Sequence, residues 1–242
     1  MDVGFIHGVM NTDNTTVSGE TLDYGPCAFM DEFHPAKVFS YIDHGGRYAF
    51  DRQPAIVHWN LARLAECLLM LDDDPSQFEQ QLHRVKPLFE DHYNARMRRK
   101  LGLHAENAEE EAGDVALVRE WLTYLQSNEL DYTLSFRELA ARTSDEGPPR
   151  FGEFEEKWRR RLAMQANSAA SVTASMNAVN PLFIPRNHQV ERAIQAAVEG
   201  DLSIFNELRK VLARPFDEQP GLARYATPPL PEERVVRTFC GT

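Results

Sequence analysis

The sequence predicts a mainly α-helical fold with one short β-hairpin close to the first residue. From residue 53 onward, apolar residues recur at helical spacing, and Pro, Gly or acidic stretches interrupt them at intervals typical of helix ends. Residues 14–23 combine β-branched residues with a tight reversal, which is the pattern of a hairpin. We find no internal repeat and no convincing domain linker, so residues 1–242 are expected to form one unit.

The predicted hairpin turns at Ser18-Gly19, a dipeptide suited to a two-residue loop. This register pairs Thr15 with Leu22 and Asn14 with Asp23. Because directly opposed residues have Cβ atoms about 4.5–5.5 Å apart, Asn14 and Asp23 would meet at the open end of the hairpin. Magnesium takes oxygen ligands and is often held by one or two carboxylates plus substrate phosphates. The hairpin therefore predicts a magnesium site, and the alternative is that these side chains only stabilise turns.

Residues 26–53 are predicted to be irregular, because prolines and a pair of glycines interrupt them. The polar side chains of this segment invite a second metal site or a substrate contact; they are His34, Asp43, His44, Arg47 and Arg52. Their spacing fits no metal-binding pattern, so structural hydrogen bonding is the favoured role.

A helix is predicted from Pro54 to about Leu71, because proline suits a first helical turn and the apolar residues that follow share a face. That face holds Ile56, Leu61, Leu64 and Leu68. On the same helix, Trp59 is expected in the core, His58 at its boundary and Cys67 in buried packing.

Two capping boxes predict the starts of further helices. They are Ser76 with Glu79 and Ser135 with Glu138, which have the S-x-x-E spacing. Pro87 lies inside the first of these helices, so a kink or break is expected there.

The middle of the chain alternates helices with exposed connections. Residues 105–113 are acidic and are expected to form a connection, whereas residues 114–127 are amphipathic. The predicted apolar stripe of the latter is Val115, Val118, Leu122 and Leu125. A loop is predicted at 143–152, followed by a helix around 154–167 whose Arg159–Arg161 run is expected to be a solvated face.

The last part of the chain begins with NPLFIPRNH at 180–188, where proline stands on both sides of an apolar triplet. This motif predicts an extended segment that crosses the surface and anchors the final helices. Helices are predicted at 189–199 and 203–213, because Gly200 would end the first and Asp201 would cap the second. Repeated prolines from residue 214 onward predict an extended tail.

The composition is that of an ordinary globular protein, with 43% hydrophobic and 26% charged residues. The net charge of -11 argues against a general nucleic-acid binder, since phosphate contacts need clustered Lys and Arg. No apolar run approaches the roughly 20 residues of a membrane-spanning helix, and residues 1–30 lack the layout of a signal peptide. We therefore expect a cytoplasmic protein without a nucleic-acid or membrane partner.

The chain has three cysteines, Cys27, Cys67 and Cys240, which are too few and too scattered for a zinc site or a disulfide framework. Cys240 lies on the tail, so it is expected to be more exposed and more reactive. Cys27 comes shortly after the predicted hairpin.

The segment HGVMNTDN, residues 7–14, resembles the protein-kinase catalytic loop H-R-D-L-x-x-x-N in its His-to-Asn spacing. Residues 23–25, Asp-Tyr-Gly, stand where kinases have D-F-G, whose Asp holds magnesium together with the loop Asn. One position departs from kinases. Val9 replaces the catalytic Asp and cannot accept a proton, while a new carboxylate appears at Asp13. An ordinary kinase mechanism is therefore not expected.

Together with four other segments, HGVMNTDN resembles the selenoprotein O (YdiU) family of kinase-like protein adenylyltransferases. The others are LDYGP (22–26), GRYAFDRQPAIVHWNLARLAE (46–66), NPLFIPRNH (180–188) and PPLPEERVVRTFCGT (228–242). They keep the order of that family's C-terminal half. The resemblance implies a kinase-like C-lobe with additional C-terminal helices, in which residues 1–72 carry the catalytic and metal-binding segment and residues 73–242 form the helical C-terminal part.

The resemblance also implies a reaction, the transfer of AMP from ATP to a Ser, Thr or Tyr hydroxyl of a protein substrate. By carry-over, Asp13 is the catalytic base, and Asn14 and Asp23 are ligands of Mg2+ or Mn2+, with Asp23 also close to the nucleotide. Members of the family often carry a Cys or selenocysteine near the C-terminus that is associated with redox control. A Cys27–Cys240 disulfide that switches the site is therefore one alternative that the resemblance opens.

Other parts of such an enzyme are not found in this sequence, which contains no G-x-G-x-x-G and no G-x-x-x-x-G-K-[ST] pattern. We therefore expect a fragment in which the N-lobe is absent, with an N-terminal half as a candidate partner. Two alternatives stay open. One is a protein kinase in which Asp13 replaces the lost base, and the other is a non-catalytic scaffold or regulatory fragment.

Overall fold

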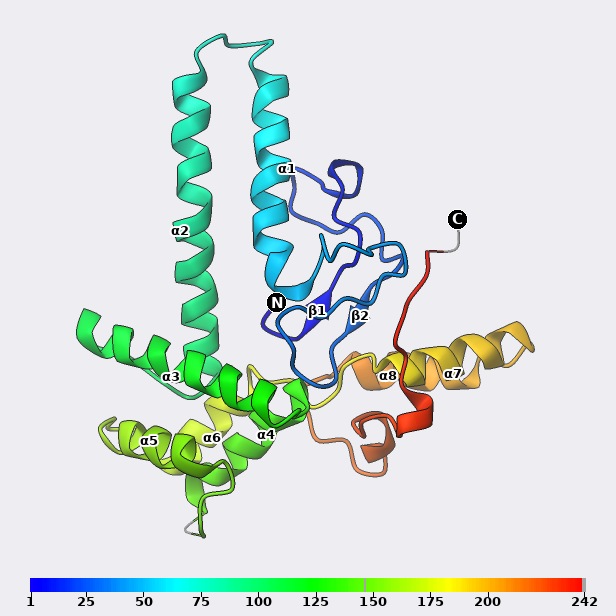
Figure 1. Ribbon diagram of the computed structural model, residues 1–242. Coiled ribbons are helices and arrows are strands. Elements are labelled where there is room, and N and C mark those ends of the chain that lie inside the picture. Colours follow the sequence, from blue (N-terminus) through cyan, green and yellow to red (C-terminus); the bar gives the residue numbers. More distant parts are fainter. Residues whose placement is uncertain (146, 241–242) are drawn as a thin grey trace.

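A computed structural model describes residues 1–145 and 147–240, and it is built mostly of helices (Figure 1). Strands β1 (Phe5–Ile6) and β2 (Ala28–Phe29) form a two-stranded antiparallel sheet. The helices are α1 (Gln53–Leu68), α2 (Pro75–Lys100), α3 (Ala108–Ser127), α4 (Tyr132–Ala141), α5 (Gly152–Ala163), α6 (Ala169–Asn177), α7 (Asn187–Val198) and α8 (Ser203–Leu212). The prediction of a mainly helical fold with a small antiparallel β element is confirmed, while its likeness to a kinase C-lobe stays a prediction.

The predicted hairpin is only partly correct, because β1 and β2 flank it and do not form it. The chain does reverse between them, but an isolated bridge joins Thr15 to Thr21 and not to Leu22, so the predicted register is wrong by one residue. The Thr16 hydroxyl donates to the Glu20 carbonyl and accepts from the Glu20 amide, at 2.7 and 3.0 Å. These side-chain bonds close a wider loop than the predicted two-residue turn.

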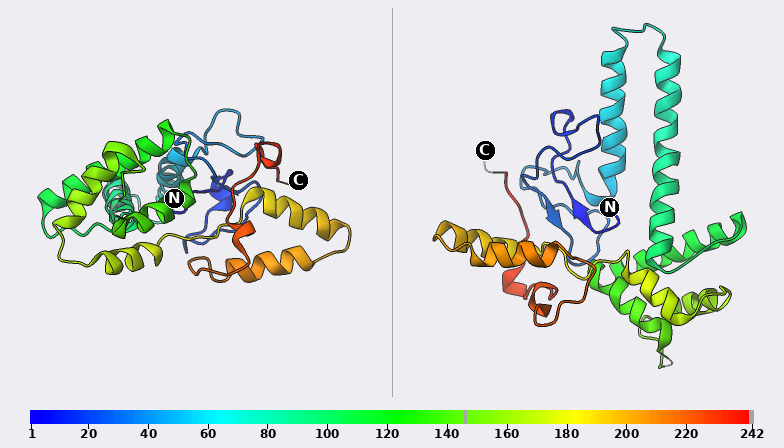
Figure 2. Two further views of the ribbon diagram at one scale, coloured as in Figure 1. Left: turned by 90° about the horizontal axis from the view of Figure 1, so that it is seen from below. Right: turned by 180° about the vertical axis from the view of Figure 1, so that it is seen from behind.

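Helices α1 and α2 form an antiparallel pair that projects from the rest of the molecule (Figures 1 and 2). The predicted break at Pro87 is wrong, since α2 continues through it as one helix of 26 residues. A proline in a helix removes one hydrogen bond and crowds the preceding turn. Here the residues around Pro87 are mostly exposed, so water can satisfy the carbonyl that loses its partner.

The helix caps differ from the two predicted capping boxes. Helix α2 begins at Pro75, and the Asp74 side chain accepts a hydrogen bond from Ser76 N at 2.9 Å. Helix α4 is capped by Asp131, whose side chain accepts from Leu134 N at 2.7 Å. In both cases an Asp that precedes the predicted Ser caps the helix first, and Asp is at least as good an N-cap as Ser.

The acidic stretch at 105–113 is another correction, because α3 already begins at Ala108. The Asn107 side chain caps it by accepting from Glu110 N at 3.0 Å. The glutamates in its first turn are favourable there, since the N-terminus of a helix attracts negative charge. The buried residues of α3 are Asp114, Val118, Trp121 and Leu125, so the stripe was predicted correctly at two positions.

The Arg159–Arg161 run of α5 is not simply a solvated face. Arg161 binds the buried Asp114 at 2.7 Å, and Arg159 binds the buried Glu155 at 2.6 Å. Because α3 and α5 pack against each other, Arg161 reaches Asp114 on the neighbouring helix, whereas Arg159 and Glu155 are one turn apart on α5. Spacing along α5 could not reveal the Asp114 partner of Arg161.

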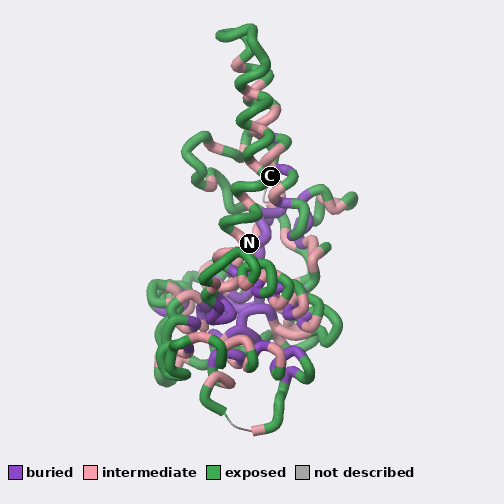
Figure 3. Tube along the Cα trace, turned by 90° about the vertical axis from the view of Figure 1, so that its left-hand side faces the viewer, coloured by how far each residue is buried: buried purple, intermediate pink, exposed green. Residues whose placement is uncertain are grey.

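The main hydrophobic core lies below the projecting pair, where the buried part of the trace is concentrated in Figure 3. It joins residues from the first part of the chain, including Ile6, Met30 and Phe50, to residues of α2–α6, including Trp121 and Trp158. A second cluster is formed by α7, α8 and the tail. The residues on either side of position 72 therefore share one core.

Two residues of α1 that were predicted to be buried are exposed. Trp59 is 40% exposed, and Cys67 also lies at the surface. Only one side of α1 faces the body of the molecule, and Gln53, Ile56 and Asn60 are its buried residues. The outer turns of α1 extend beyond the core, so their apolar side chains gain less burial than the helical pattern suggests (Figure 3).

The C-terminal predictions are confirmed in part. Residues 180–186 are mostly buried and do not cross the surface, and short 3-10 helices at Ala223–Tyr225 and Pro231–Glu233 interrupt the predicted extended tail. Residues 180–186 lie outside any helix, α7 and α8 follow within two residues of the predicted bounds, and Asp201 accepts from Ser203 N at 2.8 Å. The buried Arg186 binds Asp31 at 2.6 Å and also pairs with Asp131, so this segment is anchored to two distant parts of the chain. No helix in the described residues has the length and apolarity needed to cross a membrane.

Candidate functional site

The HGVMNTDN loop is held in place by two polar side chains of α1. Gln53 accepts from His7 N at 3.0 Å, and Asn60 donates to Met10 O at 3.0 Å and to Thr15 Oγ1 at 2.8 Å. Gln53 and Asn60 are seven residues apart, or about two turns, so they lie on one face of the helix. Neither Gln53 nor Asn60 was predicted to hold the loop, because the pattern that identifies α1 consists of its apolar residues. The sequence does contain a signal for them, because two amide side chains stand at helical spacing inside an apolar pattern.

The loop places Asp13 at the surface. Residues Thr12–Asn14 form a short 3-10 helix, in which Asp13 is exposed and Asn14 is half-buried. Asn14 Nδ2 donates to Val9 O at 3.2 Å. Since the amide nitrogen is engaged by this bond, the carbonyl oxygen of Asn14 remains as the atom available to a cation. The Tyr48 hydroxyl also donates to Asn11, which fixes the start of the same turn.

Asp23 follows the loop in sequence, two residues after Thr21, and is exposed. Its Oδ1 accepts from Gly25 N at 2.9 Å, which fixes the direction of the side chain and leaves Oδ2 available. The bridge between Thr15 and Thr21 brings the chain near Asn14 and the chain near Asp23 to the same end of the loop. The structure therefore places the predicted residues on adjoining segments, although the register differs from the predicted one.

The donor set fits a hard cation that also binds substrate. No group of three or more His, Cys, Asp or Glu side chains suitable for a metal occurs in residues 1–145 and 147–240. Asn14 and Asp23 would supply two oxygen ligands, and magnesium commonly takes its remaining ligands from water and from substrate phosphates.

His7 has a structural place in the loop. It is buried, and its Nδ1 accepts from Val9 N at 3.4 Å. Its ring contacts the Phe5 ring edge-on, with centroids 6.3 Å apart. These contacts orient the residues that precede Asp13, so His7 shapes the loop.

Asp43 and Arg52 make structural hydrogen bonds in the 26–53 segment, as predicted, whereas the Arg47 guanidinium contacts aromatic rings. Asp43 accepts from the backbone amides of Arg47 and Tyr48, at 2.7 and 2.8 Å. The Arg52 guanidinium donates to the carbonyls of Gly45 and Gly46, at 3.3 and 3.1 Å. These bonds fix the turn at residues 43–52, and the Tyr48 hydroxyl links this segment to Asn11 of the site loop.

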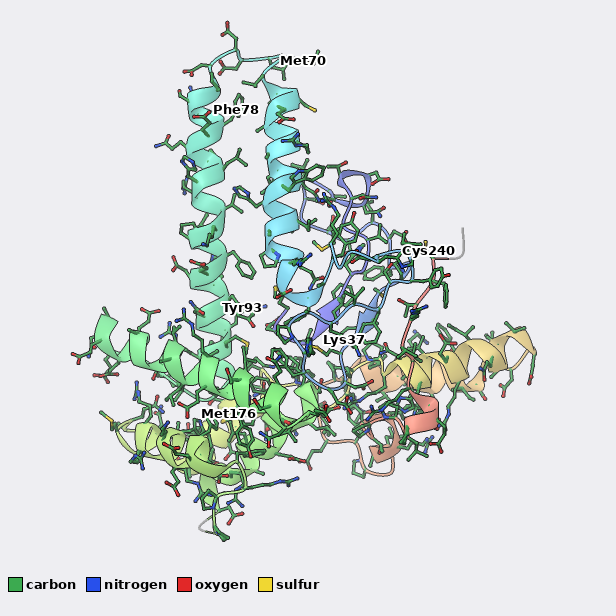
Figure 4. All side chains as sticks on the ribbon, viewed as in Figure 1. Lys37, Met70, Phe78, Tyr93, Met176 and Cys240 are labelled. Atoms are coloured by element: carbon green, nitrogen blue, oxygen red, sulfur yellow. The ribbon has the colours of Figure 1, made fainter. Side chains whose placement is uncertain are left out.

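The tail runs next to the turn that follows Asp23. Thr238 N donates to Phe39 O at 2.8 Å, and Tyr41 N donates to Thr238 O at 2.9 Å, so the tail adds a short parallel bridge to this segment. A Cβ atom placed on Gly25 would lie 3.0 Å from Cys240 Cβ. Figure 4 shows Cys240 on this side of the molecule.

The three cysteines do not have the predicted order of exposure. Cys67 is exposed, whereas Cys27 and Cys240 are half-buried, because the tail is paired and not loose. Burial raises the pKa of the Cys27 thiol, and the negative charge of Asp23 raises it further. The switching disulfide between Cys27 and Cys240 stays a prediction.

Comparison with known proteins identifies the family of this chain. A family model described as "Protein adenylyltransferase SelO" matches residues 1–213. Proteins named "Protein nucleotidyltransferase YdiU" from Bradyrhizobium diazoefficiens and Rhizobium etli are each 51% identical, over 99% and 100% of this chain. A third, from Nitrobacter winogradskyi, is 48% identical over 100% of the chain. The chain spans about half the length of these relatives, 51%, 51% and 50% respectively. The chain belongs to the SelO family of protein nucleotidyltransferases.

Proposed function

We propose that this chain provides the catalytic base and the metal ligands for transfer of AMP from ATP to a Ser, Thr or Tyr hydroxyl of a protein. Its relatives carry the name of protein nucleotidyltransferases, and its family model is described as an adenylyltransferase. The remaining contacts with ATP are assigned to the part of the relatives that this chain does not span.

Asp13 is the proposed base. It is exposed, so an incoming hydroxyl can reach it, and the loop that carries it is held by Asn60. A general base must come within about 3 Å of the proton that it removes. Val9, at the position of the kinase base, cannot serve. Asp13 would take the proton of the hydroxyl as the oxygen attacks the α-phosphorus of ATP and pyrophosphate leaves.

Asn14 and Asp23 are the proposed ligands of Mg2+, with Mn2+ as an alternative. The observation that carries this proposal is the bond from Asn14 Nδ2 to Val9 O, because it leaves an amide oxygen, and not an amide nitrogen, for the cation. When bound, the cation would neutralise negative charge on the phosphates. The bond from Gly25 N to Asp23 orients the second ligand before any metal arrives.

Label transfer from ATP tests this proposal. The chain, supplied together with the segment of a SelO-family relative that it does not span, is incubated with a protein mixture and Mg-ATP labelled at the α- or the γ-phosphate. Asp13→Asn and Asp23→Asn are the test variants, and Glu20→Gln, an exposed carboxylate of the same loop without an assigned role, is the control. We expect α-label in the wild type and the control, and at least a hundredfold loss in Asp13→Asn, typical of removing a general base. We also expect a loss in Asp23→Asn, because a carboxylate ligand of the cation is replaced by a neutral amide. Transfer of γ-label alone would instead indicate a kinase.

A further inference from the structure

A groove separates the site loop from the outer half of α1. Its volume is about 440 Å³. The loop contributes Thr12 and Val17, and α1 contributes Trp59 and Leu64. Because Thr12 directly precedes Asp13, the groove leads to the proposed base. No part of the mechanism described above uses it.

Trp59 is the prominent side chain of this groove. It is 40% exposed, whereas the other tryptophans, Trp121 and Trp158, are fully buried. The guanidinium groups of Arg47 and Arg63 lie 4.7 and 5.2 Å from the centre of the Trp59 ring. Tryptophan and arginine are the residues most enriched among those that dominate binding at protein interfaces.

Arg47 places a positive charge beside Trp59, although the chain carries a net charge of -11. Arg63 is paired with Glu66 at 2.6 Å. Arg47 has no ion pair with any carboxylate in the described residues, and its side chain is exposed. A positive group without an ion-pair partner favours a ligand of negative charge. The acidic remainder of the surface would repel the same ligand, which adds to the preference for Arg47.

We propose that this groove binds an acidic segment of the protein that receives AMP, with one apolar side chain beside Trp59 and a carboxylate on Arg47. This inference rests on the proposed function, since it places the segment next to the base. The apolar residues Val17 and Leu64 supply the hydrophobic contact, and Arg47 selects for negative charge. The hydroxyl that is modified would then lie on the same segment, on the Thr12 side.

Quenching of tryptophan fluorescence by acrylamide can test this proposal, because Trp59 is the exposed tryptophan. Two short synthetic peptides serve as probes, both containing Ser and one central Leu, one with flanking Glu and the other with flanking Lys. We expect the Glu peptide to protect the exposed tryptophan and the Lys peptide not to do so. Arg47→Gln should weaken binding of the Glu peptide about three- to tenfold. Arg160→Gln, which changes an exposed arginine on α5, should leave this binding unchanged.

Equal protection by both peptides, or by neither, would overturn the proposal. Protection that grows with protein concentration in the absence of peptide would also overturn it, because the occupant would then be a second copy of the chain. Fluorescence protection by the peptides does not require transfer of AMP. Protection by the Glu peptide without α-label transfer would refute the proposed function alone, whereas α-label transfer without protection would refute the groove alone.

Discussion

At the scale of single residues, Asn60 connects the helix to the site. Its amide donates to both ends of the loop segment that contains Asp13, at Met10 and at Thr15. A lost hydrogen bond at a buried position costs about 1–3 kcal/mol. We expect Asn60→Ala to lower α-label transfer more than tenfold. The same variant should lower the free energy of unfolding by about 1–3 kcal/mol.

Urea unfolding and label transfer measured on the same variant would check this prediction. Asn94→Ala, on α2 and away from the loop, is the matched control and should leave both unchanged. If Asn60→Ala destabilised the protein without affecting transfer, Asn60 would be a packing residue and not a positioning residue.

Lys100 predicts a dependence of stability on pH. It is buried, its Nζ lies 4.1 Å from the centre of the Phe136 ring, and burial lowers the pKa of Lys100 to about 7. In the unfolded chain the pKa is near 10.4, so between pH 7 and 10 the unfolded state binds more protons. Stability should therefore rise across this range, by at most about 1.4 kcal/mol per pH unit.

Lys100→Met should remove this rise and stabilise the protein at pH 7 by roughly 1–4 kcal/mol, because a buried cation is replaced by an apolar chain of similar length. Urea unfolding at several pH values would measure it. Lys86→Met, at an exposed position of α2, should keep the wild-type dependence. A Lys100→Met variant with an unchanged slope would mean that another group controls the titration.

At the scale of secondary structure, Pro87 is a destabilising residue within a continuous helix. Proline costs about 3 kcal/mol in a helix interior relative to alanine. Pro87→Ala should therefore raise the free energy of unfolding by roughly 1–3 kcal/mol. Pro75 is a matched control, because it occupies the first turn, where proline is well tolerated. Equal gains in the free energy of unfolding from Pro87→Ala and Pro75→Ala would show that bending of α2 has already relieved the cost of Pro87.

The elements that sequence predicts best are those that depend on local signals. Helices α7 and α8 were placed within two residues because Gly200 and Asp201 mark their ends. The caps of α2 and α4 were missed because two acceptable caps compete within a few residues. The register at Thr15 was missed because side-chain bonds of Thr16 changed the loop length.

The site was predicted in part for the same reason. The short motif around Asp13 and Asn14 is contiguous, so its residues could be identified from spacing. The role of Asn60 depends on packing between α1 and the loop, and spacing alone does not show it. The exposure of Trp59 depends on how far α1 extends beyond the core, which no local pattern encodes.

At the scale of the whole molecule, the shared core implies one folding unit across position 72. Ile6 lies in the same cluster as Trp121 and Trp158. Ile6→Ala should destabilise by about 2–5 kcal/mol and shift the unfolding transition seen by the fluorescence of these tryptophans. Ile194→Ala, at an exposed position of α7, should have little effect. If the tryptophan transition did not move in Ile6→Ala, residues 1–72 would unfold independently.

Cys67 is a site for selective chemical labelling. Its thiol is exposed on α1 and borders the same groove as Trp59. Cys27 is less reactive, because burial and then the Asp23 charge raise its thiol pKa and so reduce the thiolate fraction. A bulky maleimide would therefore modify Cys67 before Cys27. One reagent, applied without any mutation, would cover the groove while leaving Asp13 and its loop intact.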